Sequence, residues 1–212
     1  PIYANLERVS VGFANLEKHM ENCKKFGLNP VVAINKFPTD SEQETEFIIR
    51  ECAKRGVQAV VSDGWTNGGE GTAEIARAVV AEIDKGENDF KPLYNWNAPI
   101  KEKIETIAKE IYGADDVIYS KQAQLDLKKI TRLGLDHLAI CMAKTQKSLS
   151  DNDKLYARPT GFSVTVREFE YAVGAGFVIP ILGKMMRMPG LPATPASEGM
   201  TIDDNGVISG LS

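Results

Sequence analysis

The feature that most constrains the fold is a short apolar run, residues 31–34, which follows Pro30 and ends at Asn35. Four β-favouring residues bounded in this way predict a strand buried on both faces of a parallel sheet. The turn beyond the strand carries Phe37, an unusual residue for an exposed loop. Because ligands of open α/β sheets bind beyond the carboxyl ends of the strands, this turn is a candidate binding position.

A helix start follows this turn at once. Thr39 and Glu42 have the spacing of a capping box, which predicts that the helix begins at Thr39 or Asp40. Its first backbone N–H groups would then face the same crevice as Phe37.

The first half of the chain alternates helices with strands. Apolar spacing predicts helices over 12–26, 41–54 and 72–85, and strands over 31–35 and 57–61. Short loops between strand and helix make the two strands parallel, with right-handed crossovers.

The second predicted strand ends in a loop, residues 62–71, that contains four glycines and Trp65. Neighbouring parallel strands lie roughly 5 Å apart, so this loop and the Phe37 turn leave the sheet at the same edge. The two rings can then face one pocket. We interpret them as a candidate stacking slot for a planar ligand, with lids over the core as the alternative.

The second half has a different pattern, and its boundary with the first lies near residues 90–98. We therefore expect an α/β unit over 1–95 and a smaller α+β domain over 96–212. Its predicted elements are helices over 99–111 and 120–133, strands over 117–119, 138–143, 162–167 and 177–182, and a tight hairpin turn over 203–206.

Composition narrows the possible partners. The 212 residues carry a net charge of -4 with no evident basic cluster, so we expect no nucleic acid and no anionic membrane as a partner. No apolar run approaches the roughly 20 residues that span a bilayer, and a cytoplasmic location is expected.

Cys23, Cys52 and Cys141 are odd in number and lie in apolar patterns, which predicts buried thiols rather than disulfides or a metal site.

No complete catalytic motif is present: GxxxxGK[ST], HExxH, CxxC and GxSxG are all missing, and we assign no catalytic residue and no metal ligand. Residues 35–38 are similar to the guanine-reading NKxD motif of GTPases, but Pro38 replaces the aspartate. Without that carboxylate nothing accepts the N1 and N2 hydrogens of guanine, so a guanine site is not expected.

Five separated segments resemble formate tetrahydrofolate ligase, also called formyltetrahydrofolate synthetase, in order along all 212 residues. They read AINKFPTD at 33–40, GWTNGGEG at 64–71, EIYGA at 110–114, MAKTQ at 142–146 and MPGLP at 188–192.

This resemblance implies an ATP-dependent ligase of one-carbon metabolism that works as a homotetramer. Formate would take the γ-phosphoryl of MgATP to give formyl phosphate, and N10 of tetrahydrofolate would attack it to give 10-formyltetrahydrofolate. A monovalent cation is a further expected ligand. The resemblance also places the folate ring between Phe37 and Trp65, Pro38 beside the adenine or the pterin, and Asn35 and Gly64 in the same wall.

The resemblance also implies that residues 1–95 are the C-terminal part of a P-loop-type domain that binds nucleotide and folate. The family's glycine-rich ATP loop and its formyl phosphate ligands belong to an N-terminal part that is missing here, where the chain opens at Pro1. We expect this fragment to need that part as its partner and to be inactive alone. Segments 145–147 and 195–197 depart from the family pattern and receive no role.

Two other hypotheses remain open at this point. The chain could be a non-catalytic α/β protein that serves oligomerisation or binds a partner, or it could be a degenerate GTPase fragment.

Overall fold

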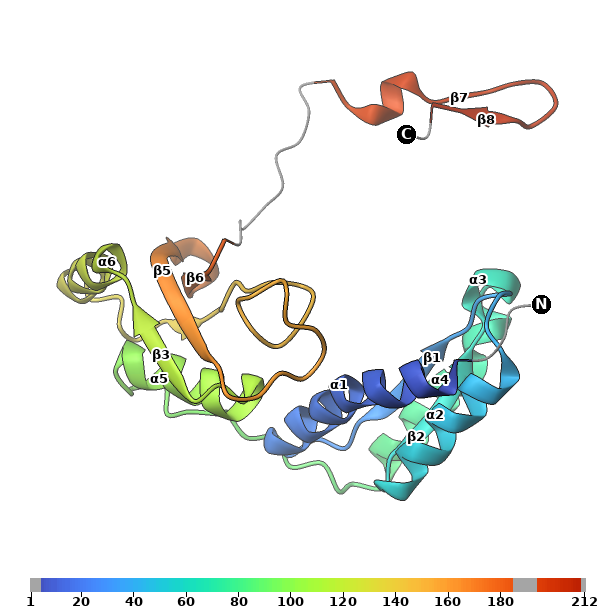
Figure 1. The fold of residues 1–212 in the computed structure, drawn as a ribbon, viewed down its shortest axis with the longest axis horizontal. Coiled ribbons are helices and arrows are strands. Elements are labelled where there is room, and N and C mark those ends of the chain that lie inside the picture. Colours follow the sequence, from blue (N-terminus) through green and yellow to red (C-terminus); the bar gives the residue numbers. More distant parts are fainter. Residues whose placement is uncertain (1–4, 185–193, 211–212) are drawn as a thin grey trace.

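The computed structural model describes residues 5–184 and 194–210 (Figure 1), so the segment 188–192 named above lies outside the described residues. The N-terminal part alternates helices with two strands. Its elements are α1 (Leu6–Lys25), β1 (Val31–Asn35), α2 (Glu42–Lys54), β2 (Gln58–Ser62), α3 (Gly64–Asn67), the 3-10 helix η1 (Glu70–Thr72) and α4 (Ala73–Asp84).

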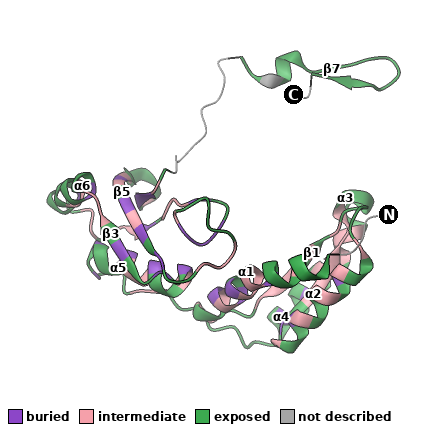
Figure 2. Cartoon of the chain, viewed as in Figure 1, coloured by how far each residue is buried: buried purple, intermediate pink, exposed green. Residues whose placement is uncertain are grey.

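Strands β1 and β2 run parallel, as the alternation of helices and strands predicts, and their register pairs Val31 with Gln58 and Asn35 with Ser62. The predicted burial of β1 on both faces is wrong, because each of its residues is half-buried or exposed (Figure 2). Within the described residues this sheet has only two strands, so its faces and outer edges are incompletely covered.

Helix α1 begins earlier than its apolar pattern predicts. The side chain of Asn5 caps it by accepting a hydrogen bond from the Arg8 N–H at 3.0 Å. Its apolar face packs on α2, and residues of β1 and β2 complete the small core. The buried members are Phe13, Met20, Cys52 and Val57, with Leu16, Val32, Phe47, Ile48 and Ala59 packed against them.

Helix α2 begins at Glu42, and its N-cap is Ser41 rather than the predicted Thr39 or Asp40. The Ser41 hydroxyl accepts the N–H of Glu44, and the Glu44 carboxylate accepts the N–H of Ser41, which completes a capping box two residues later than expected. Asp40 is not available as the cap, because its carboxylate already accepts the Phe37 N–H.

The C-terminal part holds a second core around a four-stranded mixed sheet of order β3-β5-β6-β4. The pairs β3–β5 and β4–β6 are parallel, and β5–β6 is antiparallel. Its elements are α5 (Ile100–Thr106), the π-helix η2 (Ile107–Tyr112), β3 (Asp116–Tyr119), α6 (Lys121–Arg132), β4 (Ala139–Ile140), β5 (Ser163–Ala172), the 3-10 helix η3 (Val173–Ala175) and β6 (Phe177–Leu182).

Strand β5 shows the alternation that its sequence predicts: Val164 and Val166 are fully buried, while Ser163 and Arg167 are exposed. Beyond it, the 3-10 helix η4 (Ala196–Gly199) precedes a small hairpin of β7 (Thr201–Ile202) and β8 (Ile208–Ser209). The predicted hairpin turn over 203–206 is confirmed by the pairing of these two strands.

The cysteines differ from one another in burial. Cys52 is fully buried, and burial raises the pKa of its thiol. Cys23 is half-buried, whereas Cys141 is exposed, so its predicted burial is wrong. Cys141 directly follows β4, a strand of only two residues at the edge of the sheet, where little covers it. No helix in the described ranges is both long and apolar enough to cross a bilayer.

Candidate functional site

The turns that carry Phe37 and Trp65 leave the β1–β2 sheet at one edge. The Lys36 N–H donates to the Ser62 carbonyl at 3.0 Å, which extends the pairing of the two strands by one residue. The structure thus brings Phe37 and Trp65 together: their ring centroids lie 6.4 Å apart, with 50° between the ring planes.

The Phe37 turn is closed by Asp40. The Phe37 N–H donates to the Asp40 carboxylate at 2.8 Å, and the Asp40 N–H donates to the Phe37 carbonyl at 3.0 Å. Because the main chain on both sides of the ring is fixed, Phe37 stays at the sheet edge although 43% of it is exposed. Pro38 continues the same turn and is exposed.

Trp65 lies in the short helix α3 rather than in the open loop that its glycines predict. The Asp63 N–H donates to the Gly71 carbonyl at 2.9 Å, and the Asn67 side chain donates to the Asp63 carboxylate at 2.8 Å. A Cβ on Gly71 would lie 2.1 Å from the carbonyl oxygen of Asp63, so this position needs glycine. Gly71 therefore lets the loop pack closely against its own backbone at Asp63.

The two remaining predicted residues lie on the same turns. Gly64 begins α3, and a Cβ there would lie 2.8 Å from a methyl carbon of Thr72. Asn35 ends β1 and is exposed, and its side chain makes no hydrogen bond within the described ranges. Its amide is free to bind a ligand.

This geometry suits a flat ligand after a modest rearrangement. A ring held between two others needs them nearly parallel and about 7–8 Å apart, twice the usual contact distance. The observed rings are slightly closer and tilted. Since Trp65 is 68% exposed, it can rotate without disturbing the core.

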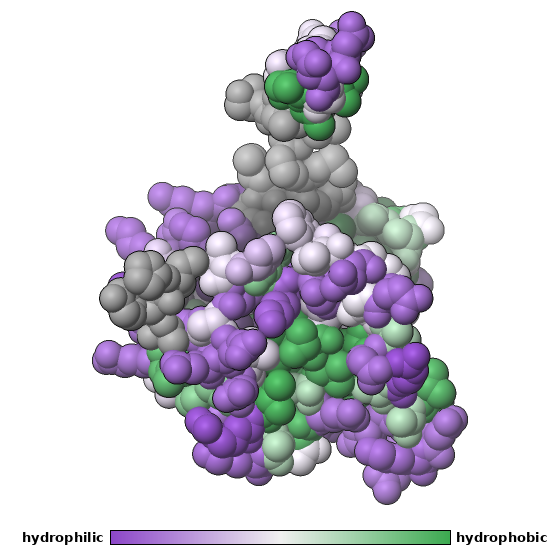
Figure 3. Space-filling model, turned by 90° about the vertical axis from the view of Figure 1, so that its right-hand side faces the viewer, coloured by the Kyte–Doolittle hydropathy of each residue, from purple (hydrophilic) through white to green (hydrophobic). Residues whose placement is uncertain are grey.

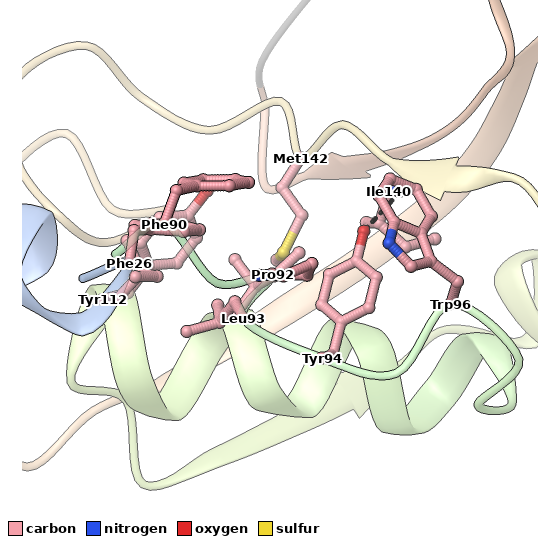
Figure 4. A pocket seen from close by; sticks show the side chains of 11 residues that line it. Phe26, Phe90, Pro92, Leu93, Tyr94, Trp96, Tyr112, Ile140 and Met142 are labelled. Atoms are coloured by element: carbon pink, nitrogen blue, oxygen red, sulfur yellow. Dashed lines mark hydrogen bonds between the residues drawn. The ribbon is translucent and has the colours of Figure 1, made fainter. Parts of the chain in front are cut away.

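A cavity of about 390 Å³ lies elsewhere, between the C-terminal end of α1 and η2 (Figure 4). Sequence reasoning missed it, although the aromatic residues of the connection between the two parts were a signal. Its lining residues are Phe26, Phe90, Pro92, Leu93, Tyr94, Trp96, Ile107, Ile111, Tyr112, Ile140 and Met142.

Comparison with known protein families agrees with the motif resemblance. A family model described as Formate--tetrahydrofolate ligase matches residues 2–212, which is nearly the whole chain. The chain therefore belongs to the formate–tetrahydrofolate ligase family, whose members are ligases of one-carbon metabolism that use ATP, formate and tetrahydrofolate.

Proposed function

We propose that this chain supplies the aromatic folate-binding pair of a ligase that makes 10-formyltetrahydrofolate from formate by way of formyl phosphate. The observation that carries the proposal is the pair Phe37 and Trp65, two exposed rings 6.4 Å apart at the carboxyl edge of parallel strands. Stacking on two rings would hold the pterin and fix the direction in which N10 faces the activated formyl group.

Three neighbours complete this proposed site. Pro38 offers an apolar surface beside Phe37 and next to the adenine or the pterin. Asn35 offers an amide that can both donate to and accept from pterin heteroatoms. Gly64 would form part of the same wall, and it has no room for a side chain, because a Cβ there would lie 2.8 Å from a methyl carbon of Thr72.

The proposal assigns residues 1–95 to the C-terminal part of a P-loop-type domain, and 96–212 to a smaller C-terminal domain. Two features support an additional partner for the first part. The β1–β2 sheet has incompletely covered faces, and α4 exposes Val79, Val80 and Ile83. The face of the molecule that Figure 3 shows carries an apolar patch framed by polar side chains.

We propose that this partner is the N-terminal part of the same protein, which would bring the ATP loop and the ligands of formyl phosphate. On this proposal the 212 residues bind folate but do not turn over MgATP by themselves. The complete enzyme would be a cytoplasmic homotetramer and would bind a monovalent cation.

Fluorescence of Trp65 tests the folate site. In a Trp96→Phe background Trp65 is the one remaining tryptophan, and tetrahydrofolate should quench it in a saturable way. Phe37→Ala should weaken binding by roughly 5- to 150-fold, because stacking on one ring is worth about 1–3 kcal/mol.

Phe90→Ala is the matched control, since Phe90 is a similarly exposed ring (62%) that lines the separate cavity. Its affinity for tetrahydrofolate should stay unchanged. Equal affinities of the Phe37→Ala and control chains would contradict the proposed site.

A further inference from the structure

The cavity between α1 and η2 is a second candidate binding site, remote from Phe37. One wall comes from Phe26 at the end of α1, and others come from residues 90–96 and from η2. Phe37 lies beyond the opposite end of β1, a strand of five residues that spans about 17 Å at 3.3 Å per residue. The cavity is therefore separate from the proposed folate site.

The cavity has aromatic groups at both ends (Figure 4). The rings of Phe26 and Phe90 lie 6.3 Å apart and are nearly parallel, with 5° between their planes. At the other end Tyr94 and Trp96 meet edge to face, with centroids 6.1 Å apart. Figure 4 shows Met142 extending between the two groups. Aromatic faces and a thioether favour a flat, polarisable ligand.

Among the residues that the structure describes, no charged side chain lines this cavity. Two ammonium groups lie close to rings of the lining: Lys103 is 5.9 Å from the centre of the Tyr94 ring, and Lys144 is 5.6 Å from the centre of the Tyr112 ring. Both lysines donate to backbone carbonyls. An anionic ligand would lose its hydration here without gaining a charged partner in the lining, and a cationic ligand would be repelled by the two ammonium groups, so the cavity favours an uncharged ligand.

Tyr94 offers a polar group to a ligand. The Tyr94 hydroxyl oxygen accepts the N–H of Ile140 at 3.0 Å, and its own hydrogen has no acceptor within the described ranges. Tyr94 can therefore donate one hydrogen bond to an acceptor atom carried by the ligand.

The cavity walls are held in place by contacts between α1 and η2. Lys18 donates to the Glu110 carbonyl at 2.9 Å, and Asn22 donates to the Ile111 carbonyl at 3.0 Å. Both donors are buried. These bonds keep α1 and η2 at a fixed separation, so the site is formed before a ligand arrives, which reduces the entropy cost of binding.

We propose that this cavity binds a small, flat, uncharged aromatic compound of about two fused rings that carries one hydrogen-bond acceptor. A volume of 390 Å³ lies within the usual range of about 300–1,000 Å³ for small-molecule sites. A ligand here touches both the N-terminal and the C-terminal part of the chain, so its binding stabilises their contact.

Fluorine NMR of the probe 6-fluoro-2-naphthol tests the proposal on the full 212-residue chain. We expect saturable line broadening, and at least tenfold weaker binding of the charged probe 6-fluoro-2-naphthalenesulfonate. Leu93→Trp, which adds a ring to the cavity wall, should abolish binding of the naphthol. Leu125→Trp, which adds a ring to the exposed surface of α6, should leave it unchanged.

Tyr94→Phe should weaken binding of the naphthol severalfold, and circular dichroism of each variant verifies that it is folded. Equal affinity of the neutral and charged probes, or unchanged binding by a folded Leu93→Trp chain, overturns the proposal. A third result would also overturn the proposal: sedimentation could show that the chain is a dimer and that the dimer dissociates as the naphthol binds. The natural occupant of the cavity would then be a second copy of the chain.

Discussion

Phe37 and Asp40 close their turn with two hydrogen bonds that run in opposite directions. The Asp40 carboxylate accepts the Phe37 N–H at 2.8 Å, while the Phe37 carbonyl accepts the Asp40 N–H at 3.0 Å. The exposed ring is thus positioned by main-chain geometry rather than by packing. Removal of the carboxylate should loosen the ring without affecting the core.

Asp40→Ala should weaken tetrahydrofolate binding about fivefold, since a hydrogen bond of this kind contributes about 1 kcal/mol. Trp65 fluorescence measures the affinity, and urea unfolding should show a loss of stability of at most about 1 kcal/mol. Thr39→Ala is the control, because exposed Thr39 makes no hydrogen bond within the described ranges. Tighter or unchanged binding by Asp40→Ala would show that the turn does not position Phe37.

Gly71→Ala should destabilise the chain by about 1–3 kcal/mol, the usual cost of forcing extra atoms into a packed site. The added Cβ meets the carbonyl oxygen of Asp63 at 2.1 Å, and this atom belongs to the backbone that carries Trp65. Trp65 fluorescence should shift as well. Thermal unfolding measures the loss.

Gly69→Ala is the matched control for that change. Its φ is -62°, and a Cβ there meets nothing within 4 Å, so alanine should be neutral or stabilise by up to about 1 kcal/mol. If Gly69→Ala lost as much stability as Gly71→Ala, the contact with Asp63 could not be the reason for the loss in Gly71→Ala. The loop would then be sensitive to substitution in general.

Glu44→Gln should change how stability depends on acid pH. Hydrogen bonds from the Ser41 hydroxyl and then from the Asn5 N–H lower the pKa of the Glu44 carboxyl below its ordinary value of 4.5. The carboxylate therefore contributes stability above pH 4.5, and this contribution is lost as pH falls through the lowered pKa.

The difference in unfolding free energy between the natural chain and Glu44→Gln should be present at pH 7 and shrink toward pH 3. Urea titrations at several pH values measure it. Glu46→Gln is the control on the same helix, because Glu46 is exposed and makes no hydrogen bond in the described part of the chain. A pH-independent difference would contradict the pKa shift.

Lys103→Met should cost about 1–3 kcal/mol, the penalty for leaving buried carbonyls without a donor. Fully buried Lys103 donates to the carbonyls of Asp136 and Leu138 at 2.8 and 3.2 Å. Lys101→Met, an exposed neighbour whose ammonium lies 4.9 Å from the Tyr119 ring, should cost at most about 1 kcal/mol. Denaturant unfolding at pH 7 compares the two variants.

Burial also lowers the pKa of Lys103 below its ordinary value of 10.5. Between the lowered pKa and 10.5 the unfolded chain binds more protons than the folded one, so the stability of the natural chain should rise with pH there. Lys103→Met should lack this rise. If stability rose similarly with pH in both chains, a titratable group other than Lys103 would be responsible for the rise.

Much of the fold follows from local sequence patterns. Apolar periodicity and turn residues predict α1, α2 and α4, and the short loops between them predict the parallel pairing of β1 and β2. The hairpin turn at 203–206 and the alternation of Val164 and Val166 were equally readable. These features depend on neighbours within a few residues, so local chemistry determines them.

Where the sequence offers two local signals of equal strength, only the structure shows which one the chain uses. Two capping-box spacings, Thr39–Glu42 and Ser41–Glu44, compete at the start of α2, and the structure uses the second. The glycines around Trp65 predict an open loop, yet the contact between Asp63 and Gly71 folds it into a short helix.

The candidate site also has features that the sequence predicts and features that only the structure shows. The sequence alone identified Phe37 and Trp65 as rings at one sheet edge, because strand direction and loop position are local properties. Only the tertiary structure decided their 6.4 Å separation and 50° tilt, and only it joined Phe26, Tyr94 and Met142 around one cavity. Distances between residues far apart in the chain depend on how packed elements meet, and no local pattern encodes that.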